Sequence, residues 1–254
     1  MSIYRDPKKI YNYLEKWIIN YFSSFQIKGA VLGISGGVDS SLLAGLLAQT
    51  LGPENIVGVI MPCHSNPVDE QYALLVAQKF KFKTKKVDLS KSYDEMFTVV
   101  KKAIGRIDNL PAANIKPRLR MVALYAIAQQ LGYIVCGATN KDEMMYGYFT
   151  KHGDSGVDVL PLANLLKGEV KALATYIGVP QELIERVPTA GLWEGQTDEK
   201  EMGLTYKELD NYLFNGEAST SNKIKIEKAI KNSKHKRNFP VIAEIPDEIN
   251  GMKI

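Results

Sequence analysis

Short apolar runs alternate with helical segments along the first half of the chain, and this alternation limits the fold more than any other feature. The runs that predict buried strands cover residues 30–34, 55–61, 82–89 and 133–137. The segments with apolar residues at helical spacing cover 7–26, 41–52, 92–104 and 114–131, and a further helix is expected to open at Asn66-Pro67. Strands that alternate with helices predict an α/β, Rossmann-like fold: a mainly parallel, twisted sheet with helices on both faces.

The texture of the sequence changes after the fourth strand. Residues 138–166 are rich in polar residues and glycine, and they show little periodicity. The later segments that predict helices are 168–178, 181–186, 205–214 and 222–232, with a loop at 188–199. Because the chain carries no internal repeat, low-complexity tract or obvious linker, we interpret residues 1–254 as a single domain.

Composition excludes several classes of protein. The net charge is only +4, so neither nucleic acid nor a membrane surface is required as a partner. The N-terminal segment has scattered charges instead of the apolar stretch of a signal peptide or membrane span. The two cysteines, Cys63 and Cys136, each end an apolar run, which predicts buried, reduced thiols and a cytoplasmic protein, not a disulfide framework or a zinc site.

A glycine-rich loop lies between the first strand and the following helix. It consists of Gly33, Ile34, Ser35, Gly36, Gly37, Val38, Asp39 and Ser40. Adjacent glycines let the backbone approach a ligand, and the first turn of a helix offers unpaired N–H groups to an anion. With the two serine hydroxyls, these groups predict a cradle for phosphate or pyrophosphate. The loop is not a Walker loop, because no Gly-Lys-Ser/Thr follows.

Asp39 is the unusual member of this loop, because phosphate should repel a carboxylate. A divalent cation that bridges the carboxylate to phosphate oxygens would resolve the conflict, and Mg²⁺ is the usual choice. The alternative is that Asp39 only caps the helix. Glu143 follows another buried strand and is a candidate second ligand, although alone it reads equally well as a surface carboxylate.

The motif SGGVDS resembles the signature of the PP-loop ATP pyrophosphatases, which cleave ATP between the α and β phosphates. Three further stretches resemble the ammonia-dependent NAD synthetases of that superfamily: 114–129, 137–170 and 187–206. The likeness runs over nearly the whole chain in the same order. It implies an adenine nucleotide alpha-hydrolase-like fold, and a Mg²⁺- and ATP-dependent ligase that amidates deamido-NAD with ammonia through an acyl-adenylate, giving NAD, AMP and pyrophosphate.

The resemblance also assigns roles to residues. It implies that ATP contacts the glycine-rich loop together with Ala138, Thr139, Lys167 and Thr189. It implies that deamido-NAD contacts Arg118, Lys151, Asp158, His235 and Lys236, that Asp39 and Glu143 hold the metal, and that Asp39 and Ser35 are catalytic. Ala138 stands where the family has threonine, so a contact there would come from the backbone. Taken alone, Lys151 and Asp158 read equally well as solvated loop charges.

The resemblance further implies a homodimer that uses free ammonia, since the chain has no room for a glutaminase domain. Two alternative interpretations of the function stay open. One is another PP-loop enzyme, such as a tRNA-modifying ligase, which should present a basic surface. The other is a non-enzymatic nucleotide-binding module, which would not need Glu143, Lys151, Asp158 and Lys167 together.

Overall fold

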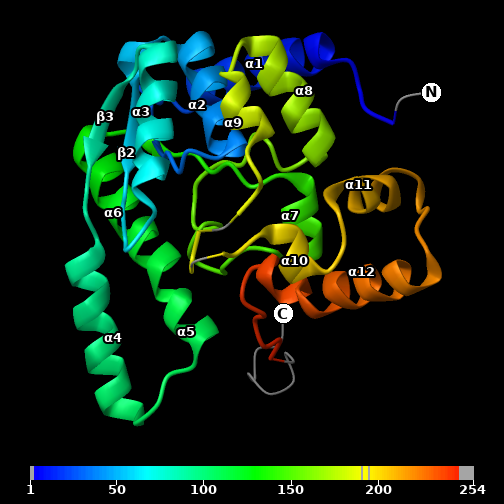
Figure 1. Ribbon diagram of the computed structural model, residues 1–254. Helices are drawn as coiled ribbons and strands as arrows, with labels where there is room; N and C mark the ends of the chain where they lie inside the picture. Colours follow the sequence, from blue (N-terminus) through cyan, green and yellow to red (C-terminus); the bar gives the residue numbers. More distant parts are fainter. Residues whose placement is uncertain (1–2, 190, 194, 246–254) are drawn as a thin grey trace, which may run out of the picture.

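A four-stranded parallel sheet forms the centre of the computed structural model, which describes residues 3–189, 191–193 and 195–245 (Figure 1). The strands, β1 (Ala30–Gly33), β2 (Ile56–Ile60), β3 (Lys83–Lys86) and β4 (Ile134–Val135), are arranged in the order β3-β2-β1-β4. All three pairings are parallel. The predicted α/β class and its parallel sheet are therefore confirmed, although β3 and β4 are shorter than the apolar patterns suggested.

Two apolar layers enclose the sheet because successive strand residues point to opposite faces. In β1, Ala30 and Leu32 pack with α1 (Pro7–Ser24), α2 (Val38–Leu51), α3 (Pro67–Phe80) and α8 (Lys167–Ile177). Val31, the residue between them, packs against α6 (Ile115–Leu131) on the other face of the sheet. α4 (Ser90–Ile104) packs partly against the same layer. Helices thus cover both faces, as the alternation of strands and helices predicts.

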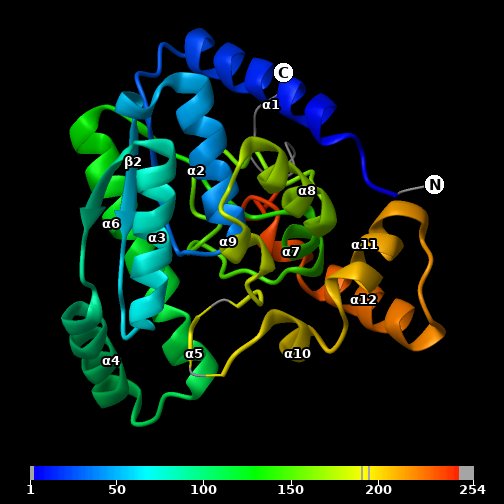
Figure 2. The ribbon, with the colours of Figure 1, turned by 45° about the horizontal axis from the view of Figure 1, so that its top comes forward.

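The last helices form a smaller layer beside the sheet. α11 (Tyr206–Asn215) and α12 (Thr220–Asn232) lie next to each other in both views, together with the short α10 (Asp198–Met202) (Figures 1 and 2). Their apolar residues make a third cluster around Leu209 and Ile226. A single 3₁₀ turn, η2 (Lys234–Lys236), follows α12. α11 contacts both α7 (Lys141–Tyr146) and α8, and α12 contacts α7, so these two helices connect the smaller layer to the rest of the fold.

Some short elements were not foreseen. α7 lies in the stretch 138–166, which we interpreted as irregular, and α5 (Asn109–Ala113) precedes α6. The side chain of Asn140 accepts the Glu143 N–H while Glu143 accepts the Asn140 N–H, which is a capping box at the start of α7. α9 (Gln181–Glu185), by contrast, agrees with the helix predicted at 181–186, and η1 (Pro53–Asn55) is a further short element. Residues 190 and 194 of the loop predicted at 188–199 lie outside the described residues.

The strand order creates a switch point between β1 and β4. The chain moves from β1 to β2 and β3 on one side and returns to β4 on the other, so the loops after β1 and β4 part from each other. In open α/β sheets such a point, at the carboxyl ends of the strands, forms a ligand crevice. Within the described residues, none of the helices is long and apolar enough to cross a membrane.

Candidate active site

A cavity of about 850 Å³ opens at the switch point, a volume typical of ligand sites. Its walls include most of the residues that the sequence singled out: Gly33, Ile34, Ser35, Gly37, Val38, Asp39, Ser40, Arg118, Ala138, Thr139, Glu143, Lys151, Lys167, Thr189, His235 and Lys236. Residues far apart in the sequence therefore converge on one space. Among the predicted residues, all of which the structure describes, Gly36 and Asp158 are not part of its walls.

The glycine-rich loop holds its shape through its own serines and through tight packing at Gly36. Ser35 Oγ accepts the N–H of Gly37 at 3.3 Å, and the hydroxyl of Ser41 donates to the Gly37 carbonyl at 2.7 Å. Gly36 has φ +74°, and a Cβ there would lie 2.7 Å from the Asp69 carbonyl oxygen. Only glycine fits this conformation and this space. Contacts within the protein thus fix the shape of the loop, and the first turn of α2 faces the cavity.

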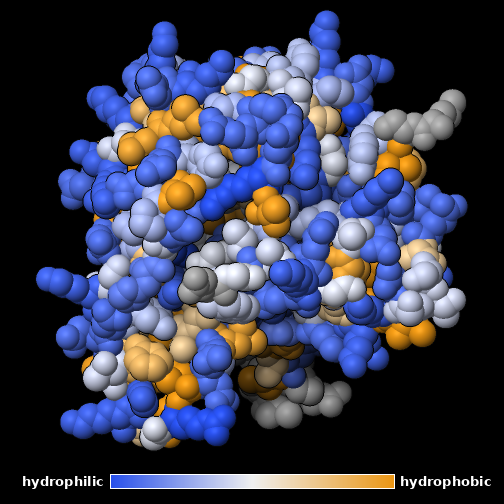
Figure 3. Space-filling model, viewed as in Figure 1, coloured by the Kyte–Doolittle hydropathy of each residue, from blue (hydrophilic) through white to orange (hydrophobic). Residues whose placement is uncertain are grey.

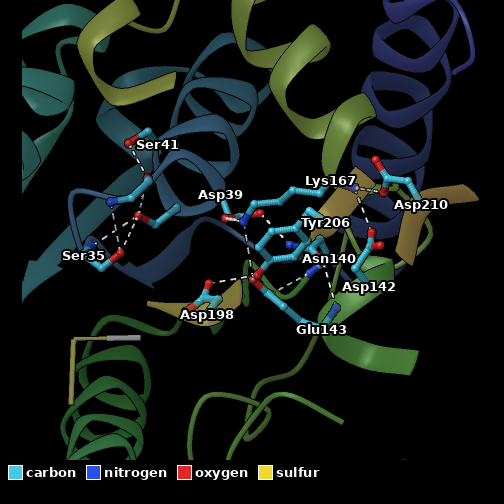
Figure 4. A network of polar contacts seen from close by, with 12 residues as sticks. Ser35, Asp39, Ser41, Asn140, Asp142, Glu143, Lys167, Asp198, Tyr206 and Asp210 are labelled. Atoms are coloured by element: carbon cyan, nitrogen blue, oxygen red, sulfur yellow. Dashed lines mark hydrogen bonds and ion pairs between the residues drawn. The ribbon is translucent and has the colours of Figure 1, made fainter. Parts of the chain in front are cut away.

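Asp39 is held between two partners on the far side of the switch point (Figure 4). The Lys167 Nζ lies 2.6 Å from Asp39 Oδ2, and Asn140 Nδ2 donates to Asp39 Oδ1 at 2.9 Å. The same ammonium lies 3.5 Å from Glu143 Oε1. The N-cap of α2 is Gly37, and the Asp39 carboxylate makes no capping bond. The reading of Asp39 as a mere helix cap is therefore wrong.

The charges of this cluster interact strongly, because Lys167 is almost fully buried. Burial would lower the pKa of Lys167, but the Asp39 and Glu143 carboxylates more than offset burial and raise it. Burial and the nearby Asp39 charge raise the pKa of Glu143, while Lys167 opposes them. The Tyr206 ring adds a cation–π contact, with Nζ 4.7 Å from its centroid. One cation thus holds two carboxylates together at the mouth of the phosphate cradle.

These carboxylates fit a magnesium ion. Asp39 and Glu143 already share one cation, the Lys167 ammonium, and both belong to the cavity wall beside the glycine-rich loop. Within the part of the chain that the structure describes, no group of three or more His, Cys, Asp or Glu side chains is arranged to hold a metal. Mg²⁺ commonly binds proteins through one or two carboxylates and completes its shell with substrate phosphates and water. The donor set is therefore of the kind whose magnesium shell is completed by water or by the phosphates of a nucleotide.

Four of the five residues expected to contact the dinucleotide, namely Arg118, Lys151, His235 and Lys236, gather in one part of the cavity wall. Arg118 Nε donates to the Lys151 carbonyl at 3.3 Å, and Lys151 Nζ donates to the His235 carbonyl at 2.9 Å. Lys236 Nζ donates to the carbonyls of Gly147 and Phe149, both at 2.8 Å. The turn that carries the His-Lys pair is therefore docked on the loop that follows α7.

Asp158 has a different surrounding. Its Oδ2 accepts the N–H of Val135 in β4 at 2.7 Å, and its Oδ1 accepts the Tyr125 hydroxyl at 3.1 Å. The carboxylate thus satisfies a donor at the edge of the sheet. A contact between Asp158 and deamido-NAD stays a prediction from the family resemblance.

Several residues of the site escaped the sequence reasoning. Arg186 Nη1 donates to the Gly36 carbonyl at 3.0 Å, and its guanidinium also pairs with Asp69, which fastens the glycine-rich loop to α3. Asp198 is buried in the cavity wall and accepts the Tyr206 hydroxyl at 2.9 Å. Asn140 was within reach of sequence analysis, because Asn-x-x-Glu is a capping-box pattern. Arg186 and Asp198 gave no local signal.

A second pair of buried carboxylates lies behind Lys167. Asp142 and Asp210 both accept the backbone N–H of Lys167, at 2.8 and 3.0 Å (Figure 4). Asp210 also accepts the Gly168 N–H, so a side chain from α11 caps α8. Burial, followed by the charge of Asp210, raises the pKa of Asp142. The start of α8, and with it the Lys167 side chain, is thereby fixed from two other helices.

Comparison with known proteins identifies the family of the chain. The family model described as NAD synthase matches residues 10–240. The NH(3)-dependent NAD(+) synthetase of Finegoldia magna is 49% identical over 89% of this chain and 92% of its own length. The corresponding enzyme of Syntrophomonas wolfei is 43% identical over 96% of this chain and 99% of its own. Among solved structures, NMN synthetase from Francisella tularensis has a TM-score of 0.90 at 34% identity, covering 95% of this chain and 100% of that one. The chain belongs to the NAD synthase family.

Proposed function

We propose that the protein is an ammonia-dependent NAD synthetase, which amidates deamido-NAD at the expense of ATP and releases NAD, AMP and pyrophosphate. Family membership supports the reaction as a whole. The observation that carries the assignment within the molecule is the convergence on one cavity of the glycine-rich loop, the Asp39–Lys167–Glu143 cluster and the basic residues Arg118, Lys151 and Lys236. A simple nucleotide-binding module would need only the first of these.

In the first step the nicotinate carboxylate attacks the α-phosphorus of ATP, and the bond to the β-phosphate oxygen breaks. The N–H groups of the glycine-rich loop hold the departing pyrophosphate, and Lys167 offsets its growing charge. Mg²⁺, when held by Asp39 and Glu143, would shield the phosphate charge during this step. The acyl-adenylate formed has a good leaving group, which a free carboxylate lacks.

In the second step ammonia attacks the acyl carbon, loses a proton, and expels AMP. We propose free ammonia as the nitrogen donor, because neither cysteine suits a glutaminase nucleophile. Cys63 and Cys136 are fully enclosed, and burial raises the pKa of both thiols. His64 follows Cys63 in sequence, but its ring Nε2 pairs with Asp94.

The decisive test is a coupled assay on the purified protein. With deamido-NAD, ATP, Mg²⁺ and ammonium, NAD, AMP and pyrophosphate should appear in equal amounts. Glutamine that supports turnover as well as ammonium does would refute the proposed donor. Pyrophosphate release that requires tRNA and ignores deamido-NAD would favour a tRNA-modifying PP-loop enzyme.

A second candidate substrate is the mononucleotide that carries the same nicotinate group. The observation in its favour is the likeness to the Francisella tularensis structure, which is named as an NMN synthetase. Adenylation and amidation would be unchanged, since the reacting carboxylate is the same. The ratio of kcat/KM for the dinucleotide and the mononucleotide decides between the two.

We also propose that the protein is a cytoplasmic homodimer in which α4 contributes to the interface. α4, which the structure describes throughout, has a strongly amphipathic sequence but no buried residue. Met96, Val99 and Ile104 expose 44%, 62% and 63% of their surface, and apolar side chains gather where Figure 1 places α4 and α5 (Figure 3). Sedimentation of the wild type and of Val99→Glu tests this: the wild type should be dimeric and the variant at least partly monomeric.

A further inference from the structure

Arg237, which directly follows the His-Lys pair, donates hydrogen bonds to the ends of two helices. Its Nη1 donates to the carbonyls of Met144 and Met145, both at 3.0 Å, and its Nη2 donates to the Ile230 carbonyl at 2.6 Å. Nη1 also donates to the Ser233 hydroxyl at 2.7 Å. The first two carbonyls belong to the last turn of α7, and Ile230 belongs to the last turn of α12.

Helix ends explain why a guanidinium suits this place. The last carbonyls of a helix have no partner within the helix, and they carry the negative end of its dipole. At the end of α7, the N–H groups of Gly147 and Tyr148 both go to the Glu143 carbonyl, so the next two carbonyls need another donor. Arg237 supplies one positive charge and a rigid fork of donors to both helices at once.

The two helices carry different parts of the site. α7 carries Glu143, which lies in the cavity wall beside Lys167, and the segment after α12 carries His235 and Lys236. The contact between them is close: a Cβ on Gly147 would lie 2.0 Å from the Ser233 Cβ. Arg237 itself is not part of the cavity wall, in the region the structure describes. It can therefore act on a ligand only through the residues that it holds.

We infer that Arg237 is a positioning residue for the dinucleotide substrate. It holds the turn Lys234–Lys236 against α7. It thereby fixes the position of His235 and Lys236 relative to the Asp39 and Glu143 carboxylates, which are expected to face ATP. The inference rests on the proposed function, because it takes deamido-NAD as the ligand of His235 and Lys236. It goes beyond that function by assigning the geometry of the dinucleotide wall to a residue outside the cavity.

The test compares Arg237→Met, Arg237→Lys and Gly147→Ala with the wild type and with Lys228→Met, which removes an exposed cation of α12. We expect Arg237→Met to raise the KM for deamido-NAD by about ten-fold or more, the effect of losing roughly one charge-assisted hydrogen bond, while the KM for ATP stays within about two-fold. The KM of Arg237→Lys for deamido-NAD should lie between those of the wild type and Arg237→Met, because an ammonium cannot reach both helix ends at once. In Gly147→Ala the new Cβ should push the turn away from α7, so this variant should show the same selective rise in the KM for deamido-NAD. Lys228→Met should show no such rise.

Hydrogen exchange of residues 233–237 gives a reading that does not depend on turnover. Exchange should speed up in Arg237→Met and Gly147→Ala while the rest of the fold stays protected. The inference is overturned if Arg237→Met leaves the KM for deamido-NAD unchanged, with only the apparent kcat falling in proportion to lost folded protein, or if it raises the KM for ATP as much as that for deamido-NAD. If the wild type does not use deamido-NAD at all, the proposed function fails instead, and exchange alone then decides whether Arg237 holds the turn.

Discussion

Lys167→Met tests the cation that joins the two carboxylates. The substitution keeps the length and apolar stem of the side chain but removes the charge 2.6 Å from Asp39 and 3.5 Å from Glu143. Removing one partner of a buried pair commonly destabilises a protein by about 3–5 kcal/mol. The two carboxylates expose 18% and 17% of their side chains, so water can solvate part of the stranded charge. We therefore expect a loss of about 1–3 kcal/mol in the free energy of unfolding.

Magnesium should reduce this loss, because the variant leaves both carboxylates free to bind it. A ligand at a hundred times its Kd stabilises the folded state by about 2.7 kcal/mol. Urea unfolding in EDTA and in Mg²⁺ measures the difference between variant and wild type, and the difference should be smaller with Mg²⁺. In the coupled assay, the kcat of Lys167→Met should fall on the order of 10²–10³-fold relative to the wild type, as for the loss of one preorganised charge contact.

Two variants sharpen the result. Lys200→Met removes an exposed lysine of α10 and should leave both stability and kcat close to those of the wild type. Asp39→Asn added to Lys167→Met removes one stranded charge, so the double variant should be more stable in EDTA than Lys167→Met alone. The reasoning is refuted if Lys167→Met matches the wild type in stability without Mg²⁺, or if the second substitution destabilises it further.

Three further outcomes follow from the described contacts. The two cysteines should resist a thiol reagent at pH 8 in the folded protein and react after unfolding in urea, since burial raises the pKa of both; rapid reaction of the native protein would contradict this. Burial would raise the pKa of Glu169, but hydrogen bonds from Arg5 outweigh it and hold the pKa below 4.5. The stabilisation by Arg5 is therefore complete above pH 4.5 and is lost as the pH falls below it, so Arg5→Gln should be less stable than the wild type at pH 7 and nearly equal to it in acid. Gly36→Ala should raise the KM for ATP by about ten-fold or more, because its Cβ meets the Asp69 carbonyl. Gly132→Ala serves as the control, since Gly132 also has a positive φ, +65°, but open space around it. Equal effects of the two substitutions on the KM for ATP would contradict the role of packing.

The fold was largely accessible from the sequence because its signals are local. A strand buried on both faces is an apolar run, and a helix on the sheet carries an apolar stripe, so β1, β2, α1 and α6 could each be recognised within their own residues. α7 was missed because six residues are too few to show a period. Its capping box was the one local mark that it left.

The site was accessible in parts. The glycine-rich loop is contiguous, and its position between a strand and a helix marks it as an anion cradle. Asp39 and Lys167 are separated by 128 positions, so their ion pair is a product of topology and leaves no pattern in the sequence. Arg186 and Arg237 donate mainly to backbone carbonyls, which every residue has, so no partner residue in the sequence marks these contacts. The family resemblance named the residues that line the cavity, but not those that hold them.

The outer strand β3 limits how copies of this protein can associate. The strand Lys83–Lys86 lies at one end of the sheet, and its sequence is Lys-Thr-Lys-Lys. A strand that exposes unpaired N–H and carbonyl groups invites another chain to pair with it, and a row of lysines opposes such pairing by mutual repulsion. At the other end, the segment around Val159 pairs with Cys136 and covers β4. Neither border of the sheet therefore favours growth into a continuous intermolecular sheet, which leaves helical surfaces for self-association and protects the protein from aggregation through its strands.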